Sequence, residues 1–249
     1  NFILFRSVRL PSMDAIPRVI SLGVLLTTVH YTFFYIGLSN TTGVNGSILN
    51  STGTFFSVLL AHFIYKNDKI SHSKIIGCIV GFAGVAIINI SGGDGIRLDL
   101  NVLGDGFIVI AAFIDSVGFI YSKRLSRAIH PITLTGFQLL FGGSLLIIIA
   151  AVNGSTLQGF TLASTLLLIY LAFLTAGAFT LWTTLFKYNK VGKLSVFKFL
   201  VPVFGTILSA VFLKEALFTL SNISSLILVC AGIYLVNSPK SKWLDRFQR

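Results

Sequence analysis

Long apolar stretches, separated by short segments that carry nearly all of the charge, follow one another along the whole chain. A membrane crossing needs about 17–25 mostly apolar residues, and eight stretches reach that length. They cover residues 18–38, 44–65, 74–90, 104–122, 131–152, 163–186, 194–213 and 221–237. Because backbone amides in lipid must be hydrogen-bonded within their own segment, each stretch is predicted to be a helix. The pattern therefore predicts an all-α integral membrane protein, a bundle with eight visible transmembrane helices.

The composition excludes most other classes of protein. Of the 249 residues, 54% are apolar and 11% are charged, and the mean hydropathy is +0.88. A soluble domain is about 25% charged, so this chain has less than half of the charge that a water-facing surface needs. A soluble enzyme, a disordered chain and a disulfide-stapled secreted domain are excluded. Asn1–Phe5 resembles the last turn of an apolar helix, and we expect the chain to be truncated there.

The positions of lysine and arginine predict the orientation in the membrane. The segments before the first span and after spans two, four, six and eight hold 16 of these residues when Arg18 and Lys74, the first residues of two spans, are counted with them. The intervening segments hold two. Cationic residues concentrate on the cytoplasmic side, so both ends of the chain are predicted to be cytoplasmic, in the cytoplasmic membrane of the cell. The net charge of +11 then reflects topology and attraction to anionic lipid headgroups rather than nucleic acid.

A weak internal repeat with a constant offset of 148 residues runs through the chain. Without gaps, the offset carries residues 18–90 onto 166–238 and superposes three spans on three spans. The identical pairs include Leu26/Leu174, Thr27/Thr175 and Gly84/Gly232. Five crossings separate the first span from the sixth, and because five is odd, the two copies are predicted to lie in opposite orientations. Inverted repeats are typical of secondary transporters, with the substrate site near the midplane between the copies.

Four short motifs in the second half of the chain resemble EamA-type permeases of the drug/metabolite transporter superfamily. They are KYNKVG at 187–192, VPVF at 201–204, LKE at 213–215 and AGIYL at 231–235. The resemblance implies ten helices in two inverted five-helix halves in the complete protein, of which this chain shows eight.

The same resemblance implies the domain organisation. Residues 1–90 would form the first EamA-type repeat, incomplete at its N-terminus, and residues 104–238 the second, five-helix repeat; 239–249 would form a basic cytoplasmic tail. Asn67 and Thr54 stand where the second repeat has Glu215 and Pro202. These two departures are expected to make the halves functionally unequal.

Polar side chains within two spans predict the lining of a central cavity. In span 44–65, spacings of 3, 4 and 3 residues place four of them on one helical face: Ser47, Asn50, Thr54 and Ser57. The offset carries this face onto Ser195, Lys198 and Pro202 of span 194–213. Polar groups inside a membrane usually face the bundle interior or a wet cavity. The alternative is hydrogen bonding and close packing between helices.

Asp115 and Lys198 are the charged candidates inside spans. Asp115 lies about 12 Å along its helix from the cytoplasmic end, too deep for a short side chain to reach the headgroups. It is therefore expected to be neutral, paired or in contact with water, and it is the proton-coupling candidate; a static pair is the alternative. Lys198 would attract a carboxylate or phosphate, or its long stem would reach the headgroups. Pro202 is expected to bend its helix.

Three further side chains are weaker candidates for substrate binding. Tyr31 and Trp182 offer aromatic faces that suit apolar or cationic substrates, although core packing is the simpler explanation. Gln138 can both donate and accept hydrogen bonds. The sequence contains no metal-ligand spacing, phosphate-binding glycine loop or nucleophile–base pair, so no catalytic residue, metal or cofactor is expected.

Together these features predict a secondary transporter, an exporter of small organic metabolites such as amino acids or drug-like compounds that works by alternating access. One alternative is a nucleotide-sugar or sugar-phosphate antiporter of the same superfamily, which would need several cations in the cavity. The other is a membrane enzyme acting on lipid-linked substrates, which would need clustered acidic or histidine side chains. The expected partners are a small-molecule substrate and the lipid bilayer, with no nucleic acid; a homodimer is left open.

Overall fold

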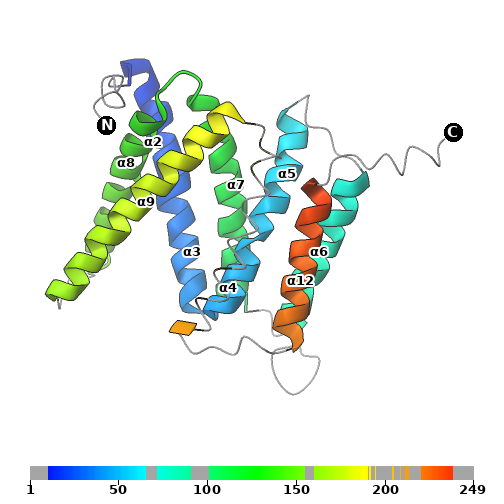
Figure 1. The fold of residues 1–249 in the computed structure, drawn as a ribbon. Coiled ribbons are helices and arrows are strands. Elements are labelled where there is room, and N and C mark those ends of the chain that lie inside the picture. Colours follow the sequence, from blue (N-terminus) through cyan, green and yellow to red (C-terminus); the bar gives the residue numbers. More distant parts are fainter. Residues whose placement is uncertain are drawn as a thin grey trace. The chain divides into compact units, whose positions relative to one another are not determined.

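The structure is a computed structural model. It describes residues 11–65, 72–90, 101–154, 160–189 and 220–237, together with Val191, Leu194, Phe204, Leu208, Val211 and Phe212. The described part of the chain is helical and contains no strand (Figure 1). The prediction of an all-α protein is confirmed.

The helices follow the predicted spans closely. The first long helix consists of η1 (Met13–Ala15), α2 (Ile16–Gly23), the π-helical segment η2 (Val24–Val29) and α3 (His30–Ser39). The π-helical η3 (Val102–Gly106) likewise opens into α7 (Phe107–Leu125). The others are α4 (Gly43–Asn50), α5 (Thr52–Ile64), α6 (His72–Ile90), α8 (Pro131–Val152), α9 (Leu162–Tyr188) and α12 (Leu220–Asn237).

Five stretches of the described residues are helical, long and apolar enough to cross a membrane: Met13–Ser39, Asn45–Ile64, Val102–Leu125, Pro131–Val152 and Leu162–Tyr188. Helices α6 and α12 cover two further predicted spans, 74–90 and 221–237. The predicted span 194–213 lies outside the described residues apart from five positions. The count of eight spans therefore stays a prediction.

Local chemistry explains where several helices begin and end. Pro131 stands at the first helical position of α8, where its missing N–H costs nothing. Helix α9 begins with a capping box in which Thr161 and Ser164 satisfy each other's backbone N–H. Gly154, two residues beyond α8, has φ 73°, a left-handed conformation that glycine adopts readily after a helix.

The described chain packs as two compact units, which do not coincide with the predicted repeats at 1–90 and 104–238; that division stays a prediction. The first unit contains Asn1–Tyr31 and Gly118–Asn189. In it, α2 and η2 pack on α8, and α8 packs on α9. Its apolar core is formed by Val19, Leu22, Leu26, Leu125, Ile129 and Leu134.

Close backbone contact holds the first helix against α8. A Cβ added to Gly23 would lie 2.7 Å from the carbonyl oxygen of Gln138 and 3.2 Å from the amide nitrogen of Gly142. Thr28 Oγ1, on the π-helical segment, donates to the carbonyl of Gly142 at 2.9 Å. Small residues that permit such close approach are typical of helix contacts in membranes.

The second unit contains Thr32–Val117 and Lys190–Arg249. Its core is formed by Ile48, Leu49, Phe55, Val58, Ile108, Val229 and Ile233. Helices α6 and α12 lie side by side (Figure 1). Gly84 is close to Ser225 and Val229, whereas Gly232 is close to Gly77 and Gly81. Because higher numbers in one helix meet lower numbers in the other, the pair is antiparallel.

Candidate functional site

Buried hydroxyl and amide groups make contacts between four helices of the first unit: α7, α8, α9 and the first long helix. Thr135 Oγ1 on α8 donates to Thr183 Oγ1 on α9 at 3.4 Å, and the hydroxyls of Thr183 and Ser122 are also 3.4 Å apart. Gln138 Nε2 donates to Thr27 Oγ1 at 3.5 Å. These five side chains, here called the polar cluster, are all buried. Their mutual distances are at the long limit for hydrogen bonds, so the contacts within the cluster are weak.

Gln138 is the most unusual member of the polar cluster. Its side chain is fully buried, and Oε1 has no hydrogen-bond partner among the described residues. A buried acceptor left without a donor costs about 1–3 kcal/mol. Gln138 therefore offers an acceptor to any donor that enters the cluster.

Aromatic rings lie beside the polar cluster in the same unit. Trp182 stacks on Phe186 with ring centroids 5.7 Å apart and lies 6.4 Å from Phe119. Phe119 stacks on Phe179 at 6.0 Å, and Phe179 lies 6.4 Å from Tyr31. We call these five rings the aromatic cluster. Trp182 precedes Thr183 in α9, so one helix carries members of both clusters.

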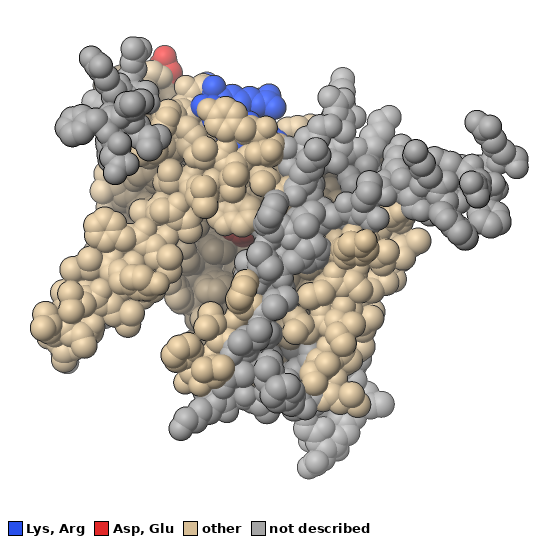
Figure 2. Space-filling model, viewed as in Figure 1, with Lys and Arg blue, Asp and Glu red and all other residues tan. Residues whose placement is uncertain are grey.

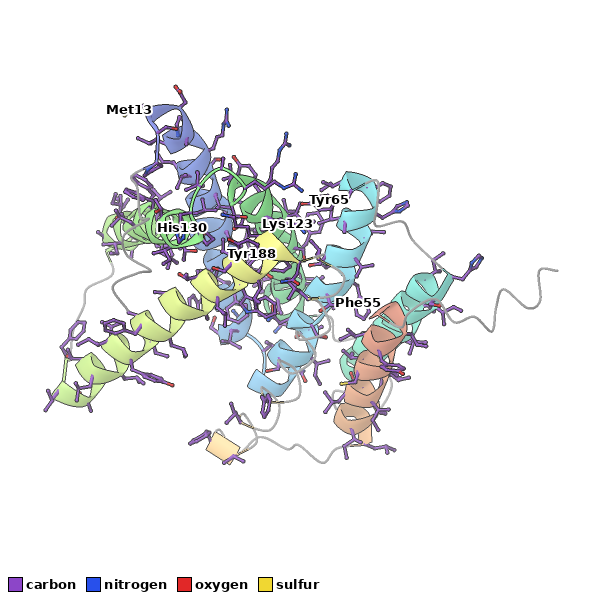
Figure 3. All side chains as sticks on the ribbon, turned by 45° about the horizontal axis from the view of Figure 1, so that its top comes forward. Met13, Phe55, Tyr65, Lys123, His130 and Tyr188 are labelled. Carbon is purple, nitrogen blue, oxygen red and sulfur yellow. The ribbon has the colours of Figure 1, made fainter. Side chains whose placement is uncertain are left out.

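The basic end of α7 is one of the segments that the sequence predicts to be cytoplasmic, and this orientation stays a prediction. The last turn of this helix contains Lys123 and Arg124, and Figure 2 shows Lys and Arg side chains gathered at one end of the molecule's described surface. Lys123, close to Tyr188 in Figure 3, donates from Nζ to the carbonyl of Asn189 at 2.7 Å. A cation at the end of α9 also interacts favourably with the helix dipole.

In the second unit, the predicted polar face of α5 contacts α7. Ser57 Oγ donates to Ser116 Oγ at 3.1 Å, and Ser116 Oγ donates to the carbonyls of Gly53 and Ala112 at 2.7 and 2.9 Å. Thr54 is buried, and its Oγ1 has no hydrogen-bond partner among the described residues. The contact of Ser57 is of the helix–helix kind that sequence analysis gave as the alternative to a cavity.

The remaining predicted site residues fall into two groups. Ser47 and Asn50 are half-buried on α4, and Asp115 is half-buried on α7, directly before Ser116. Ser195, Lys198 and Pro202 lie outside the described residues, so their matching face and any contact of Lys198 with Asp115 stay predictions. Within the described ranges, no three His, Cys, Asp or Glu side chains are grouped so that they could hold a metal ion.

The structure thus brings Gln138 together with the polar cluster and places Tyr31 and Trp182 in the aromatic cluster. Sequence analysis did not single out Thr135, Thr183 or Phe186. The feature of the sequence that could have indicated them is helical spacing. Thr135 lies three residues before Gln138, and Phe186 lies three residues after Thr183. Such spacing shows which side chains share a face of a helix, but the neighbour that meets this face comes only from the fold.

These features define a helical, multi-pass membrane protein with buried polar groups between its helices. The model of the EamA-like transporter family matches residues 1–90 and 102–238, and the chain belongs to this family. It is therefore a membrane transporter of the drug/metabolite transporter superfamily, as the motifs in the sequence predicted.

Known relatives and a solved structure agree with this assignment. The chain is 30% identical over 221 residues to the uncharacterized transporter YvbV of Bacillus subtilis (strain 168), covering 86% of this chain and 70% of the relative. It is 25% identical over 222 residues to an uncharacterized transporter of Archaeoglobus fulgidus, covering 89% and 77%. It is 26% identical over 216 residues to a WAT1-related chloroplastic protein of Arabidopsis thaliana, covering 84% and 51%. A protein of known crystal structure shares the fold with a TM-score of 0.69 at 20% identity, covering 99% of this chain and 82% of that one.

Proposed function

We propose that the protein is a secondary transporter that exports a small organic metabolite across the cytoplasmic membrane by alternating access between two inverted halves. Both ends of the chain would be cytoplasmic, and Asp115 would couple transport to protons. The family assignment and the transporter names of the relatives support transport rather than enzymatic catalysis.

The contacts between α6 and α12 support the inverted arrangement. Adding or subtracting the offset of 148 converts Gly84 into Gly232, Ser225 into Gly77 and Val229 into Gly81. The neighbours of Gly84 are thereby converted into the neighbours of Gly232. If a two-fold axis relates two copies, every contact between them must reappear when each residue is replaced by its equivalent in the other copy. The contacts of Gly84 and Gly232 meet this requirement. Inverted repeats of this kind suit alternating access.

The observation that carries the substrate proposal is the buried acceptor of Gln138, which has no hydrogen-bond partner among the described residues. The same unit also contains the hydroxyls of the polar cluster and the rings of the aromatic cluster. No Asp, Glu, Lys or Arg is among the described buried side chains of the first unit. An anionic sugar phosphate would need cationic partners such as arginine. The described groups instead suit a neutral, zwitterionic or cationic molecule that donates hydrogen bonds and carries an apolar or planar part, since aromatic faces also attract cations.

The first experiment identifies the ligand. The purified full-length protein is heated with amino acids, amines and sugar phosphates in separate samples, because a compound that binds the native state raises the melting temperature. Amino acids or amines should raise it. A response to sugar phosphates alone would contradict the proposed substrate class and favour the antiporter.

The second experiment replaces Gln138 with Met, a side chain of similar length without hydrogen-bonding groups. Oε1 has no hydrogen-bond partner among the described residues, and the bond from Nε2 to Thr27 Oγ1 is long, at 3.5 Å. Losing both groups should therefore leave the melting temperature unchanged or slightly raised. The kcat/KM for uptake of the identified compound into proteoliposomes should fall by about 5- to 150-fold, the equivalent of about 1–3 kcal/mol for a buried group that loses its hydrogen-bond partner. If the only role of Gln138 were to join helices, melting temperature would fall and transport per folded molecule would not. Leu168→Met on the exposed part of α9 is the control and should change neither.

A further inference from the structure

Helix α5 of the second unit begins inside an apolar membrane stretch rather than at its edge. Helix α4 ends at Asn50 and α5 starts at Thr52. The break at Ser51 therefore lies six residues, about 9 Å, inside the stretch that begins at Asn45. The first N–H groups of a helix have no acceptor within that helix and give this end a partial positive charge. Inside a membrane, such groups need a partner from the protein or from a ligand.

The side chains that could cap the start of α5 are present but do not cap it. Helix α9 shows the complete arrangement, in which Thr161 and Ser164 each accept a bond from the other's backbone N–H, at 3.2 and 2.9 Å. Ser51 and Thr54 have the same spacing at the start of α5, yet no side chain caps this helix. Ser51 Oγ instead donates to the carbonyl of Ile48 in α4 at 2.5 Å. The hydroxyl placed to cap α5 thus satisfies the end of α4.

Thr54 carries a buried hydroxyl that makes no hydrogen bond. The residue is 1% exposed, and its Oγ1 has no partner among the described residues. The other two hydroxyls of α5 are bonded, since Thr52 Oγ1 donates to the carbonyl of Leu49 at 2.7 Å and Ser57 Oγ donates to Ser116. Side chains on a helix tilt toward its N-terminus, so the hydroxyl of Thr54 lies over the first turn. The start of α5 can therefore present O–H and N–H donors together.

Helix α7 covers one side of this start. A Cβ on Gly53 would lie 3.2 Å from the carbonyl oxygen of Ala112, and Ser116 Oγ donates to the carbonyl of Gly53 at 2.7 Å. Asp115, directly before Ser116, is half-buried. When ionised, its carboxylate disfavours a second, simple anion nearby. A zwitterion is not disfavoured in this way, because it brings its own positive charge.

We propose that the start of α5 binds the carboxylate of a zwitterionic amino acid through the hydroxyl of Thr54 and the N–H groups of Thr52 and Gly53. Helix N-termini bind anionic groups in this manner, and the ammonium group of the ligand balances the charge of Asp115. The site rests on the proposed function, because the amino acid is taken to be the transported compound and alternating access must open this buried start to it. It narrows the proposed substrate class to zwitterions.

The test compares amino acids with their amides, which lack the carboxylate. The common amino acids and the corresponding amides are added separately to the purified full-length protein, and dissociation constants are measured by titration calorimetry. At least one amino acid should bind about 10-fold or more tightly than its own amide, as expected for hydrogen bonds to a charged group. If no amino acid bound better than its amide, the site would be refuted. Transport of amines would then still support the transporter, so the two failures are distinguishable.

The substitution Thr54→Val tests the hydroxyl itself. Because Oγ1 makes no hydrogen bond in the structure, the melting temperature should stay unchanged or rise. Affinity for the amino acid should fall by about 10- to 150-fold, the effect of losing one hydrogen bond to a charged group, whereas Thr54→Ser should retain it. Unchanged affinity in Thr54→Val would overturn the proposal, and if this variant did not fold, the comparison with amides would still decide.

Ser57→Ala is the matched control for Thr54→Val. Its hydroxyl lies three residues further along α5 and is bonded to Ser116. Losing this bond between helices should lower the melting temperature and leave the preference for the amino acid over its amide unchanged. An equal loss of that preference in Ser57→Ala and Thr54→Val would assign the effect to helix packing and refute the site.

Discussion

The crossing of α6 and α12 gives a sharp prediction about stability, through the substitution Gly232→Ala. A Cβ at this position would lie 2.5 Å from the carbonyl oxygen of Gly77 and the amide nitrogen of Gly81, and 2.8 Å from the Cα of Gly81. All three are backbone atoms, so no side chain can rotate away. Ordinary contacts begin near 3.4 Å, and the two helices would have to separate by about 0.9 Å at this point.

Two opposing effects determine how Gly232→Ala changes the free energy of unfolding. Overpacking a close contact costs about 1–3 kcal/mol, while alanine is favoured over glycine within a helix by about 1 kcal/mol. Gly136→Ala on α8 isolates the second term, because no atom of the described residues lies within 4 Å of a Cβ there. Relative to that control, Gly232→Ala should therefore lose about 1–3 kcal/mol. For a chain of this length, this corresponds to a melting temperature about 2–12 °C lower.

Both variants are heated in the same detergent at the same rate, because unfolding of large proteins is often irreversible and the apparent melting temperature then depends on the scan. Gly84→Ala is a second probe of the crossing. Its Cβ would lie 2.9 Å from the carbonyl oxygen of Ser225, so the loss should have the same sign and be smaller. If Gly232→Ala melted at or above Gly136→Ala, the close antiparallel contact of α6 and α12 would be refuted.

Two further predictions concern topology and coupling. Cysteines at the exposed positions Asn40 and Asn153 should react with membrane-impermeant reagents from outside intact cells. A cysteine at exposed Arg127 should react only after the cells are permeabilised. External labelling at Arg127 would reverse the predicted orientation. Asp115→Asn should flatten the dependence of uptake on pH between about 5.5 and 8 because it removes the proposed proton carrier, and an unchanged pH profile would end that role for Asp115.

The boundaries of the helices were the most predictable part of this fold. The apolar stretch 131–152 coincides with α8, and 163–186 lies within α9. Membrane helices are so predictable because lipid offers no partner to backbone amides, which leaves length and apolarity as sufficient signals. The π-helical segment at Val24–Val29 was not predicted, since its residues are as apolar as those of the α-helix on either side.

The neighbours of the polar side chains were much less predictable. The spacing from Ser47 to Ser57 puts Thr54 and Ser57 on the same side of a helix, and both are buried. It gave no indication that Ser116, 59 residues later, would accept a hydrogen bond from Ser57. Likewise, Gln138 meets Thr27 across 111 residues. Helical periodicity determines which residues share a face, whereas the helix opposite that face depends on how the whole bundle packs.

The two kinds of helix contact in this protein suit different roles. At Gly232, backbone atoms of two helices approach so closely that not even a methyl group fits, and such a contact cannot open without separating the helices. In the polar cluster, hydrogen bonds of 3.4–3.5 Å join Gln138, Thr135 and Thr183 to their neighbours. Bonds of this length contribute little, so these groups can change hydrogen-bond partners at small cost. The proposed transport cycle needs both: contacts that hold helices together, and polar groups whose existing bonds are weak enough to be exchanged for those of a substrate.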